Sequence, residues 1–494
     1  MSSIILFNPQ SSASAKPVLP MSLLAVGAVL EGKHRYVIVD GNLEKNPYSA
    51  LRAAIDQVPD RPILGVTVMP GPQLERAVPI CRELKEIYPR LIVIWGGYFP
   101  TQHWESCLRS SFVDIVIRGH GELVLLAYLD QLDSGEEDLA AIPGLAHRNP
   151  AGKPVTNPLA PIPNPEELPP WNFDHIPVAK YLRNTFLGTR TLGYHSSYGC
   201  PFFCNFCAVV NMVNGRWIPQ SAKTVARNMV TYHNRWGVNA VEFNDNNFFT
   251  SQARVAEFAE RIMDLDMAWW GEGRIDTLQM YSQDTWRKMR DSGLRMVFMG
   301  AESGSNETLK RMDKGGKMSV ENTLEMARFM RSWNIVPEFS FVLGNPPDPE
   351  EDSRKTIELI RQVKKVNPDA EIIMYLYTPV PLAGELYDEA KAEGFAFPNS
   401  LEEWVSPEWL NFSQRRSGNI PWINSKLRNQ IHDFERVVNA YYPTSTNGRL
   451  TKNRRVFLRV LSAWRYHLRL YRLPVELQLA QKLVSYQRPE TSGF

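Results

Sequence analysis

The sequence contains few cysteines, no long apolar run and almost no net charge. Five cysteines among 494 residues cannot form a disulfide framework. No stretch of about 18 apolar residues occurs, so we expect no membrane-spanning segment. The net charge of +2 gives no reason to expect a nucleic-acid partner. The first ten residues lack a basic start and a long apolar core, so they predict a strand rather than a signal peptide, and we expect a reducing, cytoplasmic location.

Residues 1–140 alternate short apolar runs with helical stretches. This pattern predicts a doubly wound, Rossmann-like α/β domain with a parallel sheet, whose ligand would bind at the carboxyl ends of the strands. The expected strands are Ile4–Phe7, Tyr36–Val39, Ile63–Val68, Leu91–Trp95 and Ile115–Ile117.

Three further regions follow. Residues 141–185 are rich in proline, with ten prolines between Pro143 and Pro177, and we interpret them as an extended linker. Residues 186–390 return to the β/α rhythm and predict a partial (β/α)6 barrel of the TIM type, with its site at the strand ends. Residues 391–494 predict a mostly helical substrate or lid region. The expected barrel strands are Leu192–Ser197, Ala240–Asn244, Trp269–Ile275, Met296–Ala301, Glu338–Leu343 and Ile372–Thr378.

The strongest chemical signal lies just past the first barrel strand. Cys200, Cys204 and Cys207 are separated by three and two residues, so their thiolates can converge on three corners of a [4Fe–4S] cluster. No fourth cysteine is near, which leaves one iron open to an outside ligand. A zinc site is the alternative, with His195 or His233 as the fourth ligand. Cys81 and Cys107 stand alone and are interpreted as small buried side chains.

Cys-x3-Cys-x2-Cys after the first strand of a six-unit barrel resembles the signature of radical S-adenosylmethionine (SAM) enzymes. The resemblance implies that the open iron binds SAM, whose cleavage yields a 5′-deoxyadenosyl radical. Polar and glycine residues at the later strand ends match the family in order along the chain. Asn246 beside Asp245 leaves open which side chain of that segment contacts SAM. The SAM contacts implied by the resemblance are Phe206, Asn244, Asp245, Arg274, Glu302, Ser303 and Gly344.

The first domain is similar to the cobalamin-binding domain of the B12-dependent radical SAM class, which has the same domain order. This resemblance implies cobalamin at the strand ends, although His120 stands where the class usually has Glu and the usual histidine motif for a lower cobalt ligand is absent. The alternative is a Rossmann-like domain that has lost this cofactor or binds a nucleotide. The implied cobalamin contacts are Met69, Pro70, Gln73, Gly96, Gly97, Tyr98, Arg118, Gly119 and Glu122.

Together the resemblances imply a cobalamin-dependent methyltransferase. It would act on an unactivated carbon of a small or lipid-like molecule, through the 5′-deoxyadenosyl radical and methylcobalamin. It would also need an electron donor such as a reductase with flavodoxin, or a ferredoxin. One alternative is a non-methylating oxidoreductase like the anaerobic bacteriochlorophyll ring cyclase, and another is a non-enzymatic cobalamin or metal sensor. A methylthiotransferase is disfavoured, because only Cys81 and Cys107 lie upstream of the motif.

Residues 449–472 contain eight basic residues and no acidic one. Apolar side chains recur there at helical spacing, which predicts an amphipathic basic helix. Two interpretations are open: the apolar stripe packs against the barrel, or it contacts the inner face of a membrane as a peripheral anchor. The basic residues are Arg449, Lys452, Arg454, Arg455, Arg459, Arg465, Arg469 and Arg472, and the stripe is Phe457, Val460, Leu461, Trp464, Leu468 and Tyr471.

Overall fold

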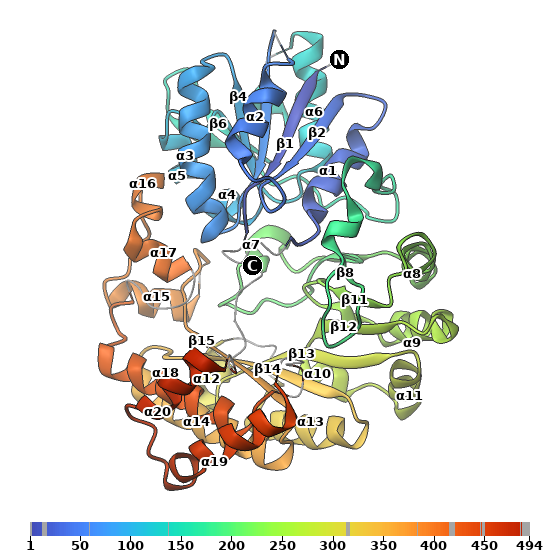
Figure 1. Cartoon of the computed structure of the whole chain (residues 1–494). Coiled ribbons are helices and arrows are strands. Elements are labelled where there is room, and N and C mark those ends of the chain that lie inside the picture. Colours follow the sequence, from blue (N-terminus) through green and yellow to red (C-terminus); the bar gives the residue numbers. More distant parts are fainter. Residues whose placement is uncertain are drawn as a thin grey trace.

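The computed structural model contains two large, mainly parallel sheets, a short two-stranded hairpin and a helical carboxyl-terminal region (Figure 1). None of its described helices is long and apolar enough to cross a membrane. The structure describes residues 2–11, 17–58, 60–136, 138–312, 317–382, 384–413, 420–444, 446, 450–484 and 486.

The first sheet confirms the predicted Rossmann-like domain. Its parallel strands are arranged in the order β2-β1-β3-β4-β5. Alternate apolar residues point to opposite faces: Phe7 joins one core and Leu6 the other. Both faces are therefore covered by helices, as a parallel sheet requires. The elements are β1 (Ser3–Asn8), β2 (Arg35–Asp40), β3 (Ile63–Thr67), β4 (Ile92–Gly96) and β5 (Ile115–Ile117), with α1 (Met21–Leu30), α2 (Pro47–Ile55), α3 (Pro72–Ile87), α4 (Tyr98–Gln102), α5 (Trp104–Arg109) and α6 (Glu122–Ser134).

The region interpreted as an extended linker also contains two strands. β6 (Leu145–Arg148) pairs antiparallel with β5, and β7 (Pro154–Thr156) pairs antiparallel with β6. The two strands extend the first sheet at its β5 edge. Proline is tolerated in β7 because this strand lies at the edge, where one side needs no ladder hydrogen bonds. The rest of the segment, as far as residue 185, runs between the sheets with only short 3-10 turns.

The second sheet confirms the six-stranded parallel barrel portion. Its order is β15-β14-β13-β12-β11-β8, so each strand neighbours the next one along the chain. The strands are β8 (Thr191–Tyr194), β11 (Ala240–Phe243), β12 (Ala268–Gly273), β13 (Leu294–Glu302), β14 (Val336–Leu343) and β15 (Glu371–Leu376).

The first barrel strand is shorter than predicted. The expected run Leu192–Ser197 is divided between β8 and β9 (Ser197–Gly199), and β9 forms a separate antiparallel hairpin with β10 (Trp217–Pro219). Between the two strands, the Ser196 amide donates to the buried Asp245 carboxylate at 3.0 Å. This bond takes Ser196 out of the barrel ladder, so the chain leaves the sheet before it reaches the cysteines.

The outer helices begin where their capping residues predict. The side chains of Ser221, Ser251, Ser282, Ser319 and Asp348 each accept a hydrogen bond from a backbone amide in the first turn. The helices that they cap are α8 (Ala222–Trp236), α9 (Gln252–Arg261), α11 (Gln283–Asp291), α13 (Val320–Ser332) and α14 (Pro349–Val366).

The carboxyl-terminal region is mostly helical, as predicted. It also links the two sheets: Trp404 packs edge-on against Phe99 with 5.1 Å between ring centroids, and the Ser106 hydroxyl donates to the carbonyl of Pro398 at 3.1 Å. Its elements are α15 (Glu385–Ala392), α16 (Leu401–Trp404), α17 (Pro407–Ser413), α18 (Ser425–Tyr441), α19 (Lys452–Leu468) and α20 (Val475–Leu483).

Candidate active site at the facing strand ends

The carboxyl edges of the two sheets face one another, with α7 (Val209–Val213) between them (Figure 1). The Gln102 side chain of the first domain donates to the Ala208 carbonyl at 3.1 Å and accepts from the Asn211 amide at 2.7 Å. The Tyr198 hydroxyl donates to the Glu122 carboxylate at 2.6 Å. Tyr198 precedes the first cysteine by two residues, so this bond attaches the β5–α6 loop to the cysteine loop.

The three predicted cluster ligands lie together in the loop after β9. Cys204 is buried, and Cys200 and Cys207 are partly buried. Burial raises the pKa of Cys207 to about 12, and the Cys204 and Cys200 thiols add to the rise, since three neighbouring thiolates repel one another. A metal centre removes that cost, because its positive charge favours the thiolate form. The grouping therefore fits a metal-bound state.

Arg274 supplies a positive charge next to the thiols. One of its terminal nitrogens donates to the Cys204 sulfur at 3.3 Å, and its guanidinium lies 3.8 Å from the centre of the Phe202 ring. Its other nitrogens pair with the Asp276 carboxylate at 2.7 and 3.0 Å. The family resemblance implies that Arg274 contacts SAM. Its position suits a second role, in which it stabilises the negative charge of the thiolates.

Asn247 belongs at this centre, although the sequence analysis did not select it. The side chain is buried, and neither its amide oxygen nor its nitrogen has a hydrogen-bond partner in the described part of the chain. Burial raises the pKa of the Cys200 thiol, and the Asn247 side chain lies close enough to that thiol to oppose part of the rise. A buried amide without partners is costly, so it fits a site that a bound group completes. The only signal for Asn247 in the sequence is its position two residues after Asp245, which is itself a predicted SAM contact.

The zinc alternative finds little support in the geometry. Among the described residues, no three His, Cys, Asp or Glu side chains are arranged to hold a single ion. The His233 ring bonds to the Val238 carbonyl at 3.1 Å within its own helix end. His195 lies against the Tyr198 ring instead. The grouped but separate thiols suit a cluster, in which each thiolate binds a different iron.

Asp245 and Asn244 have different surroundings. Asp245 is fully buried, and its carboxylate accepts from the Ser196 amide and hydroxyl and from the Ser197 hydroxyl. These bonds fix the turn that delivers the cysteines. Asn244 lies over Gly193, where a Cβ atom would come within 2.9 Å of the Asn244 amide nitrogen. Of the two, Asn244 retains the more accessible side chain for the predicted SAM contact.

The fourth and fifth barrel strand ends are joined by a buried carboxylate. Asp352 in α14 accepts from the Ser303 hydroxyl at 2.7 Å and from the Asn345 side chain at 2.9 Å. Ser303 is therefore engaged inside the protein. Glu302 has a left-handed φ of +63°, which is rare outside glycine, and its carboxylate contributes to the raised pKa of Cys207. Glu302 therefore remains close to the thiols.

Gly344 and Phe206 complete the predicted SAM contacts. Gly344 has a φ of +75°, its carbonyl accepts from the Trp422 indole at 2.9 Å, and a Cβ atom there would approach Ile423 to 2.6 Å. The carboxyl-terminal region thus packs directly on this strand end. Phe206 is partly buried against the main hydrophobic core, one residue before Cys207.

The predicted cobalamin contacts lie on the facing edge of the first sheet, but three of their side chains are already engaged: Glu122 accepts from Tyr198, and Gln73 and Arg118 are bonded within the first domain. Gln73 is buried; its amide nitrogen donates to Asn8 at 2.8 Å, and its oxygen accepts from the Met69 amide at 2.9 Å. Arg118 turns toward β7 and donates to the Thr156 hydroxyl at 2.6 Å. Gln73 and Arg118 therefore stabilise the strand ends. Met69, Pro70 and the glycines are better placed to contact cobalamin.

The glycines and Tyr98 provide the open part of this edge. Gly97 has a φ of +99°, and a Cβ atom would lie 3.1 Å from the Thr67 hydroxyl. Gly119 has a φ of +79°, and its amide donates to the Thr101 hydroxyl at 3.0 Å. Gly96 has no neighbour closer than 3.9 Å to such an atom. Tyr98 begins α4 and is partly exposed. The backbone can therefore approach a large flat ligand.

A partly buried acid, Glu272, lies at the third barrel strand end. Glu272 is on the face of β12 opposite Gly271 and Gly273, whose Cβ positions meet the Phe248 and Phe249 rings. Burial and the nearby Asp245 carboxylate raise the pKa of Glu272 to about 8. A carboxyl group that is protonated at neutral pH can donate a hydrogen bond, which an ordinary glutamate cannot do.

A separate cavity of about 560 Å³, bordered by α2 and residues 175–181, lies away from the cysteines.

Comparisons with known proteins agree with both resemblances. Residues 13–129 match the B12 binding domain family, and residues 194–360 match the radical SAM superfamily. The first match covers the sheet edge just described, and the second contains the three cysteines, Asn247 and Glu272.

Individual relatives are distant. An uncharacterised methyltransferase of Pyrococcus horikoshii is 27% identical over 73% of this chain and 78% of its own. The anaerobic magnesium-protoporphyrin IX monomethyl ester cyclase of Synechocystis sp. is 27% identical over 59% of this chain and 57% of its own. The radical SAM methyltransferase TsrM of Kitasatospora setae, solved with cobalamin and a [4Fe–4S] cluster, superposes with a TM-score of 0.65 and 17% identity, covering 80% of this chain and 79% of its own. This last likeness shows a shared fold.

The raised pKa of Glu272 predicts a pH-dependent stability. The folded state keeps the proton up to about pH 8, whereas the unfolded state loses it near the ordinary value of 4.5. The unfolded state binds fewer protons in this window, so the free energy of unfolding should fall as pH rises from about 4.5 to 8. The non-titrating variant Glu272→Gln should lack this loss, and its advantage over the natural protein should grow by more than about 1 kcal/mol between pH 5.5 and 8.5.

Denaturant unfolding at both pH values measures the difference. The exposed Glu393→Gln variant serves as the control, because it should follow the natural protein at every pH. A constant difference between Glu272→Gln and the natural protein would show that Glu272 titrates normally.

Proposed function

Because the chain is a radical SAM enzyme with an N-terminal B12-binding domain, we propose that it transfers a methyl group to an unactivated carbon of a small or lipid-like molecule. The observation that carries the proposal is the hydrogen bond of 2.6 Å from Tyr198 to Glu122. It joins the two cofactor edges, namely the carboxyl edge of the first sheet and the loop that carries the cysteines. A methyl donor on one edge and a radical source on the other must reach the same substrate carbon. The similarity to an uncharacterised methyltransferase supports this choice.

In the proposed reaction, different residues of the chain bind the cluster, stabilise its charge and orient SAM. Cys200, Cys204 and Cys207 hold the cluster, and Arg274 stabilises its negative charge. Asn247 and Glu302 lie close to the thiols and would orient SAM there. When bound, the cluster and SAM supply the radical that removes a hydrogen atom from the substrate, and cobalamin supplies the methyl group. The protein contributes positioning and water exclusion, which is how many cofactor enzymes act.

Glu272 is a further candidate to contact substrate. Its carboxyl is protonated at neutral pH and has no hydrogen-bond partner in the described part of the chain. Trp270, two residues earlier on the same strand face, donates to Glu338 at 3.0 Å and is thereby held in place. These side chains give the inner face of the barrel a mixed apolar and polar wall. We expect a substrate with a large apolar part and a hydrogen-bonding group.

A second candidate function is a non-methylating reaction of the same cofactors. The similarity to the magnesium-protoporphyrin ester cyclase favours it, because that relative is as similar in identity as the methyltransferase. Both functions need a one-electron donor, for which we propose a flavodoxin with its reductase, or a ferredoxin. We also propose peripheral membrane contact through the carboxyl-terminal helices.

The cluster assignment predicts a sharp difference among the five cysteines. Replacing Cys200, Cys204 or Cys207 by Ala should reduce iron from about four per chain to near zero after anaerobic reconstitution. The same change should abolish release of 5′-deoxyadenosine from SAM by the reduced protein. Cys81→Ala and Cys107→Ala, in the core of the first domain, serve as controls and should keep both properties. Full iron content in a Cys204→Ala variant would refute the assignment.

The geometry of the cobalamin edge indicates at which glycine a large side chain can exclude the ligand without straining the backbone. Gly97→Trp would also strain the backbone at φ +99°, whereas Gly96 has room for a side chain. Gly96→Trp should therefore remove at least about 90% of the corrinoid absorption through steric exclusion while leaving the iron content unchanged. Lys33→Trp, at the opposite end of the strands, should bind corrinoid normally. Undiminished absorption in Gly96→Trp would exclude this edge as the binding site.

Methyl transfer itself is tested with SAM carrying a deuterated methyl group. We expect the reduced, fully loaded protein to form a product from cell extract that is heavier by the whole labelled methyl group, together with 5′-deoxyadenosine. The Cys204→Ala protein provides the matched background. A product that forms with 5′-deoxyadenosine but never carries the label would overturn the methyltransferase proposal in favour of the second candidate.

A further inference from the structure

The outer face of α19 is apolar and turned to solvent. The predicted stripe residues Phe457, Val460 and Leu468 are 55%, 71% and 64% exposed, and Val456 and Trp464 lie exposed on the same side. The buried side chains of the helix, Leu458, Ser462, Arg465 and Tyr466, lie on the opposite side. The interpretation that this stripe packs against the barrel is therefore wrong for most of its length. Of the stripe, only Leu461 and Tyr471 are partly buried against the core.

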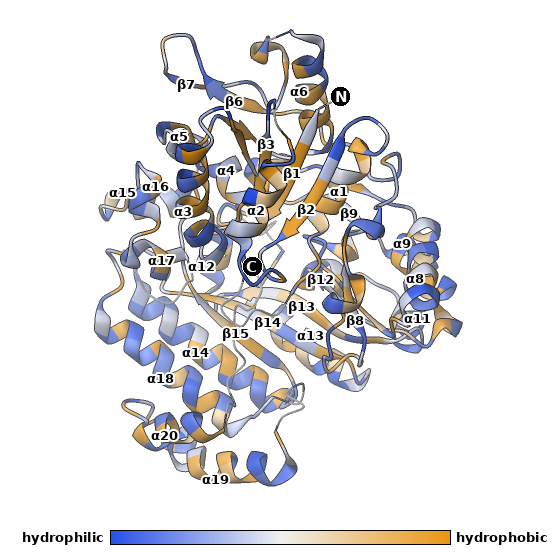
Figure 2. Cartoon of the chain, turned by 45° about the horizontal axis from the view of Figure 1, so that its top comes forward, coloured by the Kyte–Doolittle hydropathy of each residue, from blue (hydrophilic) through white to orange (hydrophobic). Residues whose placement is uncertain are grey.

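The apolar surface continues beyond α19. Residues Leu470 and Leu473 in the connection are more than half exposed, and so are Val475, Leu479 and Leu483 in α20, the last by 85%. Figure 2 shows apolar residues along both helices at the end of the molecule remote from the first sheet. Single exposed apolar side chains are common on proteins, but this many on three consecutive segments of the chain are typical of a surface that contacts a partner.

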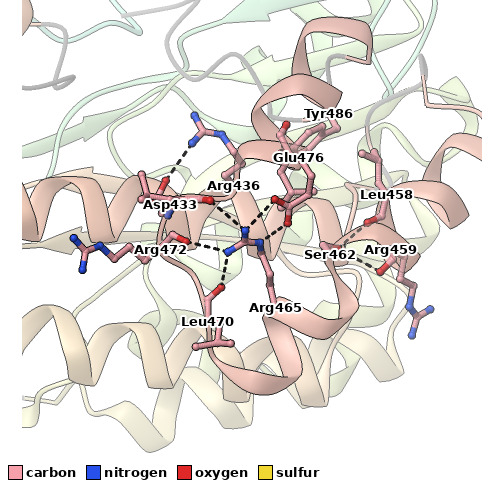
Figure 3. A network of polar contacts seen from close by, with 12 residues as sticks. Asp433, Arg436, Leu458, Arg459, Ser462, Arg465, Leu470, Arg472, Glu476 and Tyr486 are labelled. Atoms are coloured by element: carbon pink, nitrogen blue, oxygen red, sulfur yellow. Dashed lines mark hydrogen bonds and ion pairs between the residues drawn. The ribbon is translucent and has the colours of Figure 1, made fainter.

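A buried arginine fixes this surface in its outward orientation. Arg465 donates to the carbonyls of Leu470 and Arg472 at 3.1 and 3.0 Å and pairs with the Glu476 carboxylate at 2.9 Å (Figure 3). The Leu473 amide in turn donates to Asp433 of α18 at 2.9 Å. Arg465, one of the basic residues of the predicted helix, therefore links α19 to the connection and to α20, and the Leu473–Asp433 bond links the connection to α18. Because Arg465 is buried and paired, its charge does not contribute to the exposed surface.

The remaining charge around the surface is strongly positive. Within 450–484, Glu476 is the one acidic residue, and it is paired with Arg465. Lys452, Arg454, Arg459, Arg472 and Lys482 are exposed. On a helix of 3.6 residues per turn, Lys452 and Arg459 lie on one flank of the apolar face and Arg454 lies on the other. Arg469 is paired with Glu358 at 3.1 Å, and Arg449 lies outside the described residues.

We propose that α19, residues 469–474 and α20 form a docking surface for an anionic lipid bilayer. A bilayer fits both parts of the surface at once: the acyl region receives the apolar row, and the anionic headgroups meet the flanking cations. Trp464 within the row suits the boundary between the two regions. Another copy of this chain would bring the same cations together, and their repulsion disfavours that occupant.

The inference concerns a surface separate from the strand ends, so it stands or falls independently of methyl transfer. Docking would hold the protein against the source of a lipid-like substrate. It requires no membrane-spanning helix, and the described residues contain none.

Sedimentation of the full chain with phospholipid vesicles tests the apolar row. The protein should sediment with vesicles of phosphatidylcholine and phosphatidylglycerol, and much less with phosphatidylcholine alone. The double variant Val460→Ser/Trp464→Ser should bind at least about tenfold more weakly, because two exposed apolar anchors outside the hydrophobic cores are lost. Met280→Ser removes an equally exposed apolar side chain elsewhere and should bind normally.

A second set of variants tests whether the flanking cations contact the lipid headgroups. Lys452→Glu/Arg454→Glu should weaken binding at least about tenfold and remove most of its dependence on salt. Acidic residues suit the first turn of a helix, so this variant should remain folded. Lys223→Glu/Arg328→Glu carries the same charge change on α8 and α13 and serves as the control.

Two results would overturn the proposal. One is equal recovery of the natural protein in the supernatant with and without anionic vesicles. The other is a dimer in sedimentation velocity that Val460→Ser/Trp464→Ser converts to a monomer, without vesicle binding by either form, since a second copy would then cover the surface.

Discussion

The candidate site is organised around a buried hydrogen bond from Tyr198 to Glu122, which acts together with the Gln102 bonds and the contacts of the carboxyl-terminal region. Parallel sheets collect their polar loops at the carboxyl edge, so each domain alone presents half of a site. The bond joins the β5–α6 loop of the first sheet to the loop that carries the cysteines. Both groups are buried, and loss of one partner would leave the other without a hydrogen bond, which is costly. The two edges are therefore held face to face, and chemistry that needs two cofactors becomes possible.

The polar residues around this opening serve two purposes. Asp245, Asp352 and Gln73 satisfy backbone amides and neighbouring side chains, and they fix where each strand ends. Asn247 and Glu272 have no such partners in the described part of the chain, so they remain available to a ligand. Rigid strand ends around a few unsatisfied groups are the arrangement expected of a preorganised site.

The sequence predicted the strands well because buried parallel strands are continuous apolar runs with clear boundaries. It missed β6 and β7, whose short, proline-containing sequences resemble a linker, and it did not separate β8 from β9, because Ser196 leaves the ladder through a contact with Asp245, far along the chain. The spacing of the cysteines predicted that their three thiols lie together, and the structure confirms that grouping. Side-chain partners such as Asp276 for Arg274, and the outward orientation of α19, depend on tertiary packing and cannot be derived from periodicity alone.

Electron paramagnetic resonance of the loaded protein tests the central claim, that the two cofactor edges form one site. With cobalamin in the Co(II) state and the cluster reduced, the two unpaired electrons should interact, and the spectrum should be broadened or split relative to the sum of the separate signals. Tyr198→Phe, which removes the bond between the edges, should weaken that interaction while both cofactors stay bound. A spectrum of the natural protein that equals the sum of two isolated centres would contradict a shared site.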